Sequence, residues 1–90
     1  MIEIRQYIDR SDRNHFERWF EKLGDDTQAR ITVALDRLAR GNDSAKSAGA
    51  GVLELRIDFG PGYRIYFGRD GETLVILLAG GGDSKSIEHR

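Results

Sequence analysis

The sequence predicts an α+β fold, in which an N-terminal strand precedes two helices and a three-stranded antiparallel sheet. Apolar and polar residues alternate in residues 2–8 and again in 53–67, which is the two-residue period of half-buried strands. Residues 11–41 instead carry apolar side chains at three- and four-residue spacing, the period of amphipathic helices. With 90 residues the chain can build one hydrophobic core and not two. We therefore expect residues 1–90 to form a single domain with the helices packed on one face of the sheet.

The first strand and the first helix are predicted from the N-terminal third of the chain. A strand over about residues 2–8 follows from the isoleucines that alternate along it, Ile2, Ile4 and Ile8. Ser11 is the expected N-cap of the first helix, and Gly24 its expected end. The apolar face of this helix consists of four large residues: Phe16, Trp19, Phe20 and Leu23.

The second helix is predicted to follow at once. Asp25 or Asp26 is its expected N-cap, and Gly41 offers the left-handed conformation that ends many helices. Because the connection between the two helices is short, we expect them to run antiparallel as a helical hairpin. Residues 42–51, NDSAKSAGAG, are small and polar, and we expect a loop there.

The last part of the chain predicts the sheet. Strands over about 53–59 and 63–67 flank Gly60-Pro61-Gly62, and Asp70-Gly71 predicts a tight hairpin turn before a fourth strand over 73–79. The fourth strand is apolar on both faces, as is typical of a central strand, so the N-terminal strand is expected at its free flank. The predicted strand order is second, third, fourth, first. Residues 80–90 are expected to be poorly ordered or to form a short helical tail.

Composition limits the function classes. The chain has 14 basic and 15 acidic residues and a net charge of −1, so no overall field attracts it to nucleic acid. It has no cysteine and only two histidines, and we expect neither a metal nor a cofactor. The longest apolar run, 74–79, is far shorter than the roughly 20 residues of a membrane span. The N-terminus is charged from its third residue, which argues against export and favours the cytoplasm.

Two arginines lie on the predicted sheet face that points away from the helices. We expect three cross-strand pairs: Phe59 with Tyr63, Asp58 with Arg64, and Arg56 with Tyr66. Val75 and Leu77 of the fourth strand should lie on the same face. Two interpretations remain open. The face is a solvated surface with an ion pair worth about 0–1 kcal/mol, or it is a concave site for an anion with a planar group, such as a nucleotide.

Three motifs carry a resemblance to a known family. They are K-x-x-G-x-G-V-x-E-L-R-I at 46–57, GPGYRIYF at 60–67 and LLAGGGD at 77–83. With the predicted element order, they resemble the RelE/ParE toxin superfamily, and within it the HigB-like branch of phage-derived addiction module killer proteins. The resemblance covers roughly residues 14–83. It implies the RelE/ParE-like fold described above.

The resemblance also implies a function and site residues. RelE-type members are toxins of type II toxin–antitoxin systems, metal-independent endoribonucleases that cut messenger RNA in the ribosomal A site through attack by the 2′-hydroxyl. Arg64, in the GYR motif, then becomes the phosphate clamp and Arg56, in the ELR motif, a supporting charge. Lys46 would reach backbone phosphate. Tyr66 or Tyr63 would stack a base, and the outward register favours Tyr66.

The chain also departs from the RelE pattern. Glu54 stands where RelE-type toxins carry lysines, and GGDSKSIEHR lacks the motif of the usual C-terminal helix, so we expect that helix to be missing. Lys85 and His89 are then the remaining candidates for proton transfer. These departures keep open an alternative: a non-catalytic binding module, either a gyrase-inhibiting ParE-like toxin or an inactive relative that still binds an antitoxin.

The resemblance implies partners as well. A cognate antitoxin, typically a helix-turn-helix protein, would wrap the toxin and cover its active face, and an active enzyme would meet messenger RNA and the ribosome. The apolar side chains of the helix-free face, Val75 and Leu77, suit such a partner or a second copy of this chain. We therefore expect a homodimer through this face when the antitoxin is absent, and no membrane partner.

Overall fold

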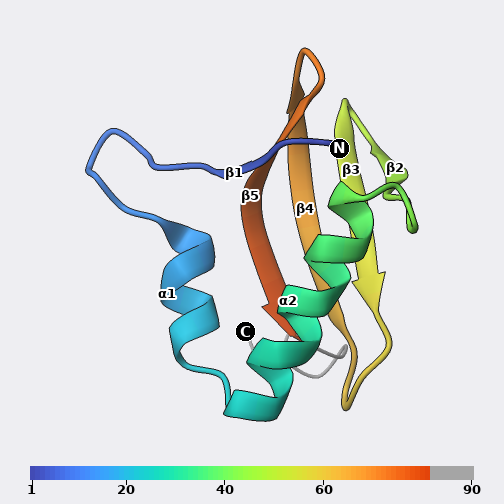
Figure 1. The fold of residues 1–90 in the computed structure, drawn as a ribbon. Helices are drawn as coiled ribbons and strands as arrows, with labels where there is room; N and C mark the ends of the chain where they lie inside the picture. The colour runs from blue at the N-terminus through green and yellow to red at the C-terminus, as the bar shows by residue number, and fades with distance from the viewer. Residues whose placement is uncertain (82–90) are drawn as a thin grey trace.

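The computed structural model describes residues 1–81, which form an α+β fold of two helices and a five-stranded sheet (Figure 1). The elements are β1 (Ile4–Gln6), α1 (His15–Glu21), α2 (Asp25–Ala39), β2 (Lys46–Gly49), β3 (Val52–Ile57), β4 (Tyr63–Asp70) and β5 (Thr73–Gly81). The strand order is β1-β5-β4-β3-β2, with β1 parallel to β5 and every other pair antiparallel. The expected tail lies outside the described residues except for its first two.

The sheet is mixed and has one strand more than the sequence predicts. The order predicted for the four expected strands agrees with β3-β4-β5-β1. The additional strand is β2, which pairs with the free edge of β3. The helices run in opposite directions over one face of the sheet, and within residues 1–81 no helix covers the other face (Figure 1). The helical hairpin is confirmed. The predicted three-stranded antiparallel sheet accounts for β3, β4 and β5 only, because β2 adds a further strand and β1 pairs in parallel.

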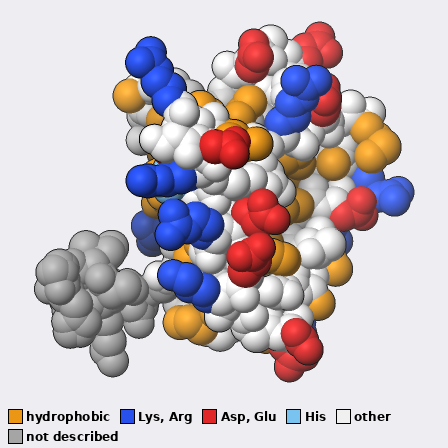
Figure 2. Space-filling view, turned by 90° about the vertical axis from the view of Figure 1, so that its left-hand side faces the viewer, with side chains coloured by type: hydrophobic (Ala, Val, Ile, Leu, Met, Phe, Trp, Pro, Cys, Tyr) orange, Lys and Arg blue, Asp and Glu red, His pale blue; other side chains and the backbone are white. Residues whose placement is uncertain are grey.

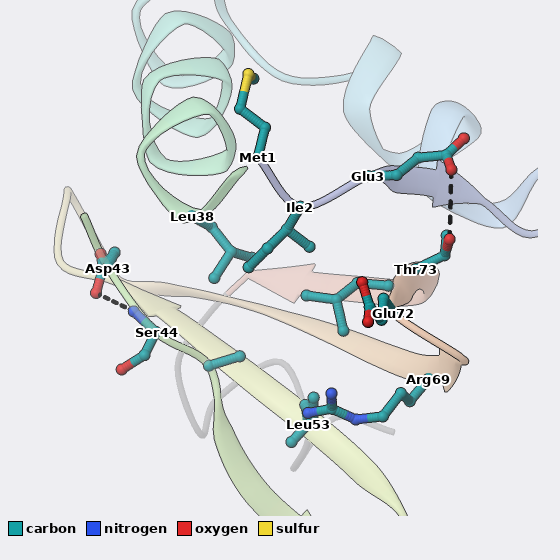
Figure 3. A pocket seen from close by; sticks show the side chains of 12 residues that line it. Met1, Ile2, Glu3, Leu38, Asp43, Ser44, Leu53, Arg69, Glu72 and Thr73 are labelled. Atoms are coloured by element: carbon teal, nitrogen blue, oxygen red, sulfur yellow. Dashed lines mark hydrogen bonds between the residues drawn. The ribbon is translucent and has the colours of Figure 1, made fainter. Parts of the chain in front are cut away.

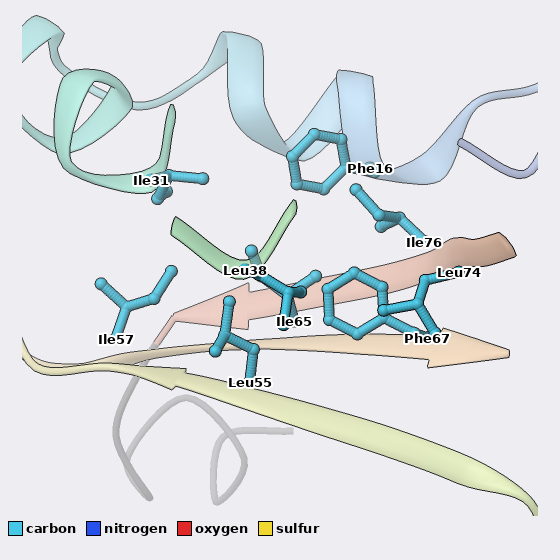
Figure 4. Close-up of a cluster of buried hydrophobic side chains, with 9 residues drawn as sticks. All are labelled: Phe16, Ile31, Leu38, Leu55, Ile57, Ile65, Phe67, Leu74 and Ile76. Carbon is cyan, nitrogen blue, oxygen red and sulfur yellow. The ribbon is translucent and has the colours of Figure 1, made fainter. Parts of the chain in front are cut away.

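The core lies between the helices and the sheet (Figure 4). It is built from side chains of both helices and of the three strands β3, β4 and β5. Its buried members are Phe16, Ile31, Leu38, Leu55, Ile57, Ile65, Phe67, Leu74 and Ile76. Every second residue of β3 and β4, and of β5 as far as Ile76, points to this side, as the predicted alternation requires. The Tyr63 ring also faces the helices, because its centroid lies 6.0 Å from that of Trp19.

The first helix begins later than predicted. Asn14 is the N-cap, and its side-chain oxygen accepts a hydrogen bond from the Glu17 amide at 2.9 Å. Ser11 is not a cap, because the Asp9 carboxylate already accepts bonds from the amides of Ser11 and Arg13, both at 2.9 Å. These bonds shape a separate turn ahead of the helix. An aspartate that binds its own downstream amides competes with helix formation.

The second helix begins after Gly24, and no side chain caps it. Asp25 and Asp26 lie in the first turn instead, where their charge is favourable to the helix dipole. The predicted cap at Asp25 or Asp26 is therefore wrong by one or two positions. Gly41 has φ of 80°, so the left-handed end predicted at this glycine is confirmed.

The N-terminal strand is shorter than predicted. Ile4 packs against the core, whereas Ile2 and Ile8 are exposed. Only residues 4–6 pair with β5, so the alternating pattern over 2–8 predicts more strand than forms. The position of this strand beside β5 is confirmed.

Part of the predicted loop at 42–51 is a strand. β2 pairs antiparallel with β3, with an irregularity between Ser47 and Gly49. Three consecutive residues, Gly49, Ala50 and Gly51, take positive φ and turn the chain back into β3. All four residues of β2 are exposed, and the strand is held by backbone pairing. It therefore leaves no apolar pattern in the sequence.

The register between β3 and β4 differs from the prediction by two residues. Ile57 faces Tyr63, where Phe59 was expected. Phe59 has left the strand, because its amide bonds back to the Ile57 carbonyl and its own carbonyl accepts the Gly62 amide. Its ring instead lies 4.6 Å from the guanidinium carbon of Arg30. A wider turn therefore replaces the tight one, and every pair along these strands changes.

A bulge in β5 changes the other side of β4. Phe67 pairs with Ile76 but Tyr66 with Leu78, so Leu77 is the additional residue. Without the bulge, Leu78 would alternate toward the core; with it, Leu78 lies opposite Tyr66 and is 52% exposed. The turn before β5 consists of residues 71–72, one position later than predicted, and Gly71 has φ of 62°.

Candidate functional site

The observed register between β3 and β4 brings together the two arginines that the sequence placed in the site. Arg56 of β3 and Arg64 of β4 are direct cross-strand partners, and Gly80 of β5 lies on the other side of Arg64. The absence of a side chain on Gly80 leaves the row open beside Arg64. In the next row, Glu54 takes the position opposite Tyr66 that was predicted for Arg56. The expected pairs of Arg56 with Tyr66 and of Asp58 with Arg64 are therefore both wrong.

One carboxylate links the two arginines. Arg56 Nε lies 3.6 Å from Glu54 Oε1, and Arg64 Nη1 lies 3.7 Å from Glu54 Oε2. The Glu54 side chain is only 17% exposed, whereas those of Arg56 and Arg64 are 67% and 49% exposed. The carboxylate thus lies low on the face, and both guanidinium groups stand in solvent beside it.

The arrangement has an electrostatic reason. Like charges directly opposite each other on neighbouring strands repel and destabilise the sheet. Glu54 places one carboxylate oxygen near each guanidinium group, which reduces the repulsion between Arg56 and Arg64. Ion pairs this exposed stabilise a fold by about 0–1 kcal/mol each. The cluster therefore contributes little to folding, and its charges remain available for an anion from solvent.

The alternation along the strand places Glu54 on the same face as Arg56, but its position between the two arginines was not predicted. Its charge marks a departure from the RelE pattern, but its place between the two arginines follows only from the β3–β4 register. The available signal was its two-residue spacing from Arg56, which places both side chains on one face of a strand.

Lys46 adds a third basic side chain, in the row next to that of the two arginines. It lies on β2, directly opposite Glu54, and its side chain is exposed. A cavity of about 450 Å³ lies beside it, lined by residues 43, 44, 46 and 47 and by the β3 segment that carries Glu54 and Arg56. The structure therefore brings Lys46, Arg56 and Arg64 onto three neighbouring strands.

The two tyrosines lie on opposite faces. Tyr66 shares the helix-free face with the arginines and is half-buried beside Leu78. Tyr63 belongs to the helix-covered face, where its ring contacts Trp19. Of these two tyrosines, Tyr66 is the one that lies on the face of the arginines and can present its ring to a ligand there. Lys85 and His89 lie outside the described residues.

Apolar side chains border the arginine rows. Val75 pairs with Gly68, and a Cβ built on Gly68 would lie 3.6 Å from a Leu77 methyl group. Leu77 thus lies on the same face as Val75, as predicted. The neighbour of Tyr66 is Leu78 and that of Arg64 is Gly80, where Val75 and Leu77 were expected.

Positive side chains gather toward the helix-free side of the molecule. On the side that carries α1, Lys and Arg line the left-hand edge in Figure 2, and Asp and Glu lie over the middle. Arg5 of β1 pairs with Val75 and lies 2.7 Å from the Glu3 carboxylate. The hydrogen bond and charge of Arg5 lower the pKa of Glu3.

The histidine in the described part of the chain is away from this face. His15 Nε2 lies 3.0 Å from Asp9 Oδ2, in the turn before α1. The Arg13 amide, followed by the His15 and Ser11 hydrogen bonds, lowers the pKa of Asp9. Within residues 1–81 no cluster of three or more His, Cys, Asp or Glu side chains could hold a metal ion. Over the same residues no helix is both long and apolar enough to cross a membrane.

A second cavity, of about 690 Å³, lies on the helix side of the sheet (Figure 3). Apolar residues from the N-terminus, the end of α2 and the strands line it, among them Ile2, Leu38 and Leu53. Arg69 of β4 borders it. It is separate from the arginine rows, since β4 directs Arg64 and Arg69 to opposite faces.

The chain is similar to known proteins over the region that holds the site. Residues 18–85 match the model of the family described as phage derived protein Gp49-like (DUF891). A Haemophilus influenzae protein named only as an uncharacterized protein is 44% identical over 71 residues, covering 77% of this chain and 72% of that protein. No solved structure matches the chain. The matched range includes Lys46, Glu54, Arg56, Arg64 and Tyr66.

Proposed function

Because the chain belongs to the phage-derived Gp49-like family, a family of RelE/HigB-like toxins, we propose that it is the toxin of a type II toxin–antitoxin pair and that it cuts messenger RNA on the ribosome. Membership of this family is consistent with the role of a toxin in a toxin–antitoxin module. The observation that supports RNA cleavage is the cross-strand pair Arg56 and Arg64, exposed and next to Tyr66. Such a pair suits a phosphodiester with a base beside it.

The proposed reaction needs charge and position more than a cofactor. The ribose 2′-oxygen attacks the adjacent phosphorus, the bond from phosphorus to the 5′-oxygen breaks, and a 2′,3′-cyclic phosphate and a 5′-hydroxyl result. Arg64 binds the phosphate and stabilises the additional negative charge of the transition state, with Arg56 in support. Tyr66 stacks one base, and Lys46 contacts the neighbouring backbone phosphate.

Two proton transfers complete this reaction. One group takes the proton of the 2′-hydroxyl, and another gives a proton to the departing 5′-oxygen. We propose His89 and Lys85 for these steps. Both residues lie outside the described residues.

A second candidate is a non-catalytic binding module of the same fold, either a gyrase-inhibiting ParE-like toxin or an inactive antitoxin-binding relative. It is favoured by the position of Glu54, which offsets part of the positive charge of the arginines. It is also favoured by His15, the histidine of the described residues, which lies on another part of the molecule. In this case the sheet face would contact a protein, without cleavage.

We propose that the antitoxin covers the helix-free face. Leu78, Leu77 and Val75 offer apolar contacts there, and the exposed arginines offer partners for acidic side chains. When the antitoxin is absent, a second copy of the chain would bury the same apolar row as a homodimer. Cleavage on the ribosome places the protein in the cytoplasm.

Induced expression in a bacterial host tests the nuclease. Wild type, Arg64→Ala and Arg69→Ala are compared for growth and for the 5′ ends of messenger RNA. Arg69 is the matched control because it lies on the same strand and carries the same charge, but faces the other way. We expect arrest with translation-dependent cuts in wild type and Arg69→Ala, and neither in Arg64→Ala.

Two other results would point elsewhere. Arrest without new 5′ ends would favour the gyrase-binding alternative. Equal cutting by wild type and Arg64→Ala would remove Arg64 from the proposed site.

A further inference from the structure

The carboxylate of Glu54 lies beside both guanidinium groups and offsets part of their positive charge. We propose that Glu54 is a specificity-determining residue, which makes this site prefer a singly charged phosphodiester inside an RNA chain over a doubly charged terminal phosphate. The inference deepens the proposed function and rests on it, because it assumes that Arg56 and Arg64 bind phosphate.

The first argument is the charge of the cluster. Two guanidinium groups on adjacent strands carry two positive charges, and one carboxylate lies within 3.7 Å of both. Within this cluster of three groups one net positive charge remains, which matches a phosphodiester. Lys46, opposite Glu54 on β2, lies beside the cluster and is assigned to the neighbouring backbone phosphate. A terminal phosphate carries nearly two negative charges at neutral pH, and the cluster would balance only one of them. Glu54 would also repel such a phosphate more strongly than it repels a phosphodiester.

The second argument is the fixed position of this carboxylate. β3 lies between β2 and β4, with Lys46 on one side of Glu54 and Tyr66 on the other. The Glu54 side chain is mostly covered, whereas both arginines are mostly or half exposed. A ligand that arrives from solvent therefore meets the guanidinium groups first, and Glu54 stays close beneath it.

The size of the effect follows from Coulomb's law. Repulsion between Glu54 and a bound phosphate scales with the charge of that phosphate. At a solvated surface we expect removal of the Glu54 charge to tighten binding of a singly charged ligand about threefold, and of a doubly charged one about tenfold. The preference for the diester should fall about threefold.

The test compares two probes on wild type and Glu54→Gln. One probe is a dinucleoside monophosphate with a 2′-deoxyribose at its 5′ position, which has a single phosphodiester and cannot be cleaved. The other is adenosine 5′-monophosphate, at about pH 7.5, above the second phosphate pKa of about 6. Affinities come from titrations that follow the backbone amide resonances of residues 54, 56 and 64.

Glu72→Gln is the matched control, since it removes the same charge at the exposed turn between β4 and β5. We expect its affinities to stay within about twofold of wild type, because charges separated by more than a Debye length of about 8 Å are largely screened. The ratio of the two affinities is the decisive quantity. A purely structural role of Glu54 would alter both affinities alike and leave their ratio unchanged.

The outcomes separate the two proposals. An unchanged ratio in Glu54→Gln, with both probes bound at the arginines, overturns the role of Glu54 and leaves the phosphate site standing. If neither probe shifts these resonances in wild type or in Glu54→Gln, the arginine pair is not a phosphate site, and both proposals fail. A ratio that falls equally in Glu72→Gln also overturns the proposal, because net charge alone would then explain it.

Discussion

The two faces of the sheet differ in burial, in charge and in what they contribute to stability. The helix-covered face is apolar and buried, with Ile65 and Phe67 fully enclosed between the strands and the helices. The helix-free face carries an exposed pair of arginines and a covered carboxylate. Burial of apolar area stabilises the first face strongly, whereas exposed ion pairs stabilise the second only slightly. One face can therefore hold the fold together while the other remains free to bind.

The largest effect on stability should come from truncating a buried side chain on the helix-covered face. Phe67→Ala removes a side chain with no exposed surface and should lower the free energy of unfolding by about 3–5 kcal/mol through lost burial and a cavity. Leu78→Ala is the control on the other face, where half of the side chain is already exposed, and should cost about 1 kcal/mol or less. Urea unfolding followed by circular dichroism measures both. Similar losses for the two variants would contradict the division between the faces.

A smaller effect should come from the turn that leads into β3. Ala50 has φ of 54°, a left-handed conformation that is unfavourable for residues other than glycine. Ala50→Gly should therefore stabilise the protein by about 0.5–1 kcal/mol, reduced by the greater freedom of glycine in the unfolded chain. Thermal unfolding with Ala48→Gly as control measures it, because Ala48 is not among the residues with positive φ. A destabilised Ala50→Gly variant would mean that this turn has another conformation in solution.

The next effect concerns the helix-free face itself. Glu54→Gln should cost about 0.5–1 kcal/mol because the facing arginines then repel each other without a bridging charge. In an Arg64→Ala background the same change should cost less, since one of the two charges is gone. A double-mutant cycle on the free energy of unfolding gives the coupling. Costs that add without coupling would show that the carboxylate does not mediate between the arginines.

The smallest effect is a pH dependence in the turn before α1. The Arg13 amide and the His15 hydrogen bond lower the pKa of Asp9 below its ordinary 3.8. A lowered folded-state pKa stabilises the protein above the unfolded-state pKa, and the contribution is lost as the pH falls through the lowered value. Asp9→Asn should therefore flatten the acid side of the stability curve below about pH 5. Chemical unfolding between about pH 2 and 6 measures this, and parallel curves for wild type and Asp9→Asn would contradict it.

The division between faces also explains what the sequence could predict. Helices and strands of the core follow from apolar periodicity, which fixes the face of residues such as Leu55, Ile57 and Ile65. The order of the four predicted strands follows from the apolar character of residues 73–79. These inferences depend on which side of a strand is buried, and alternation reports that directly.

The site could be predicted only in part, because it depends on register. Arg56, Arg64 and Tyr66 were assigned to a shared face, and they share it, whereas Lys46 was expected in a loop and lies on β2 opposite Glu54. Their neighbours could not be assigned, since the Gly-Pro-Gly turn widens through backbone bonds of Phe59 and the β5 bulge shifts Leu78. A shift of two residues keeps every side chain on its face but changes its partner. Neither hydropathy nor alternation detects such a shift.

The pairing of β1 with β5 also has a consequence for how the protein is made. Ile4 meets Leu74, and Glu3 meets Thr73 across a separation of 70 residues. Because β5 lies between β1 and β4, the sheet can close only after nearly all of these residues have been synthesised. Contacts so distant in sequence form late and slow folding. A nascent chain therefore cannot complete the five-stranded sheet until β5 has left the ribosome.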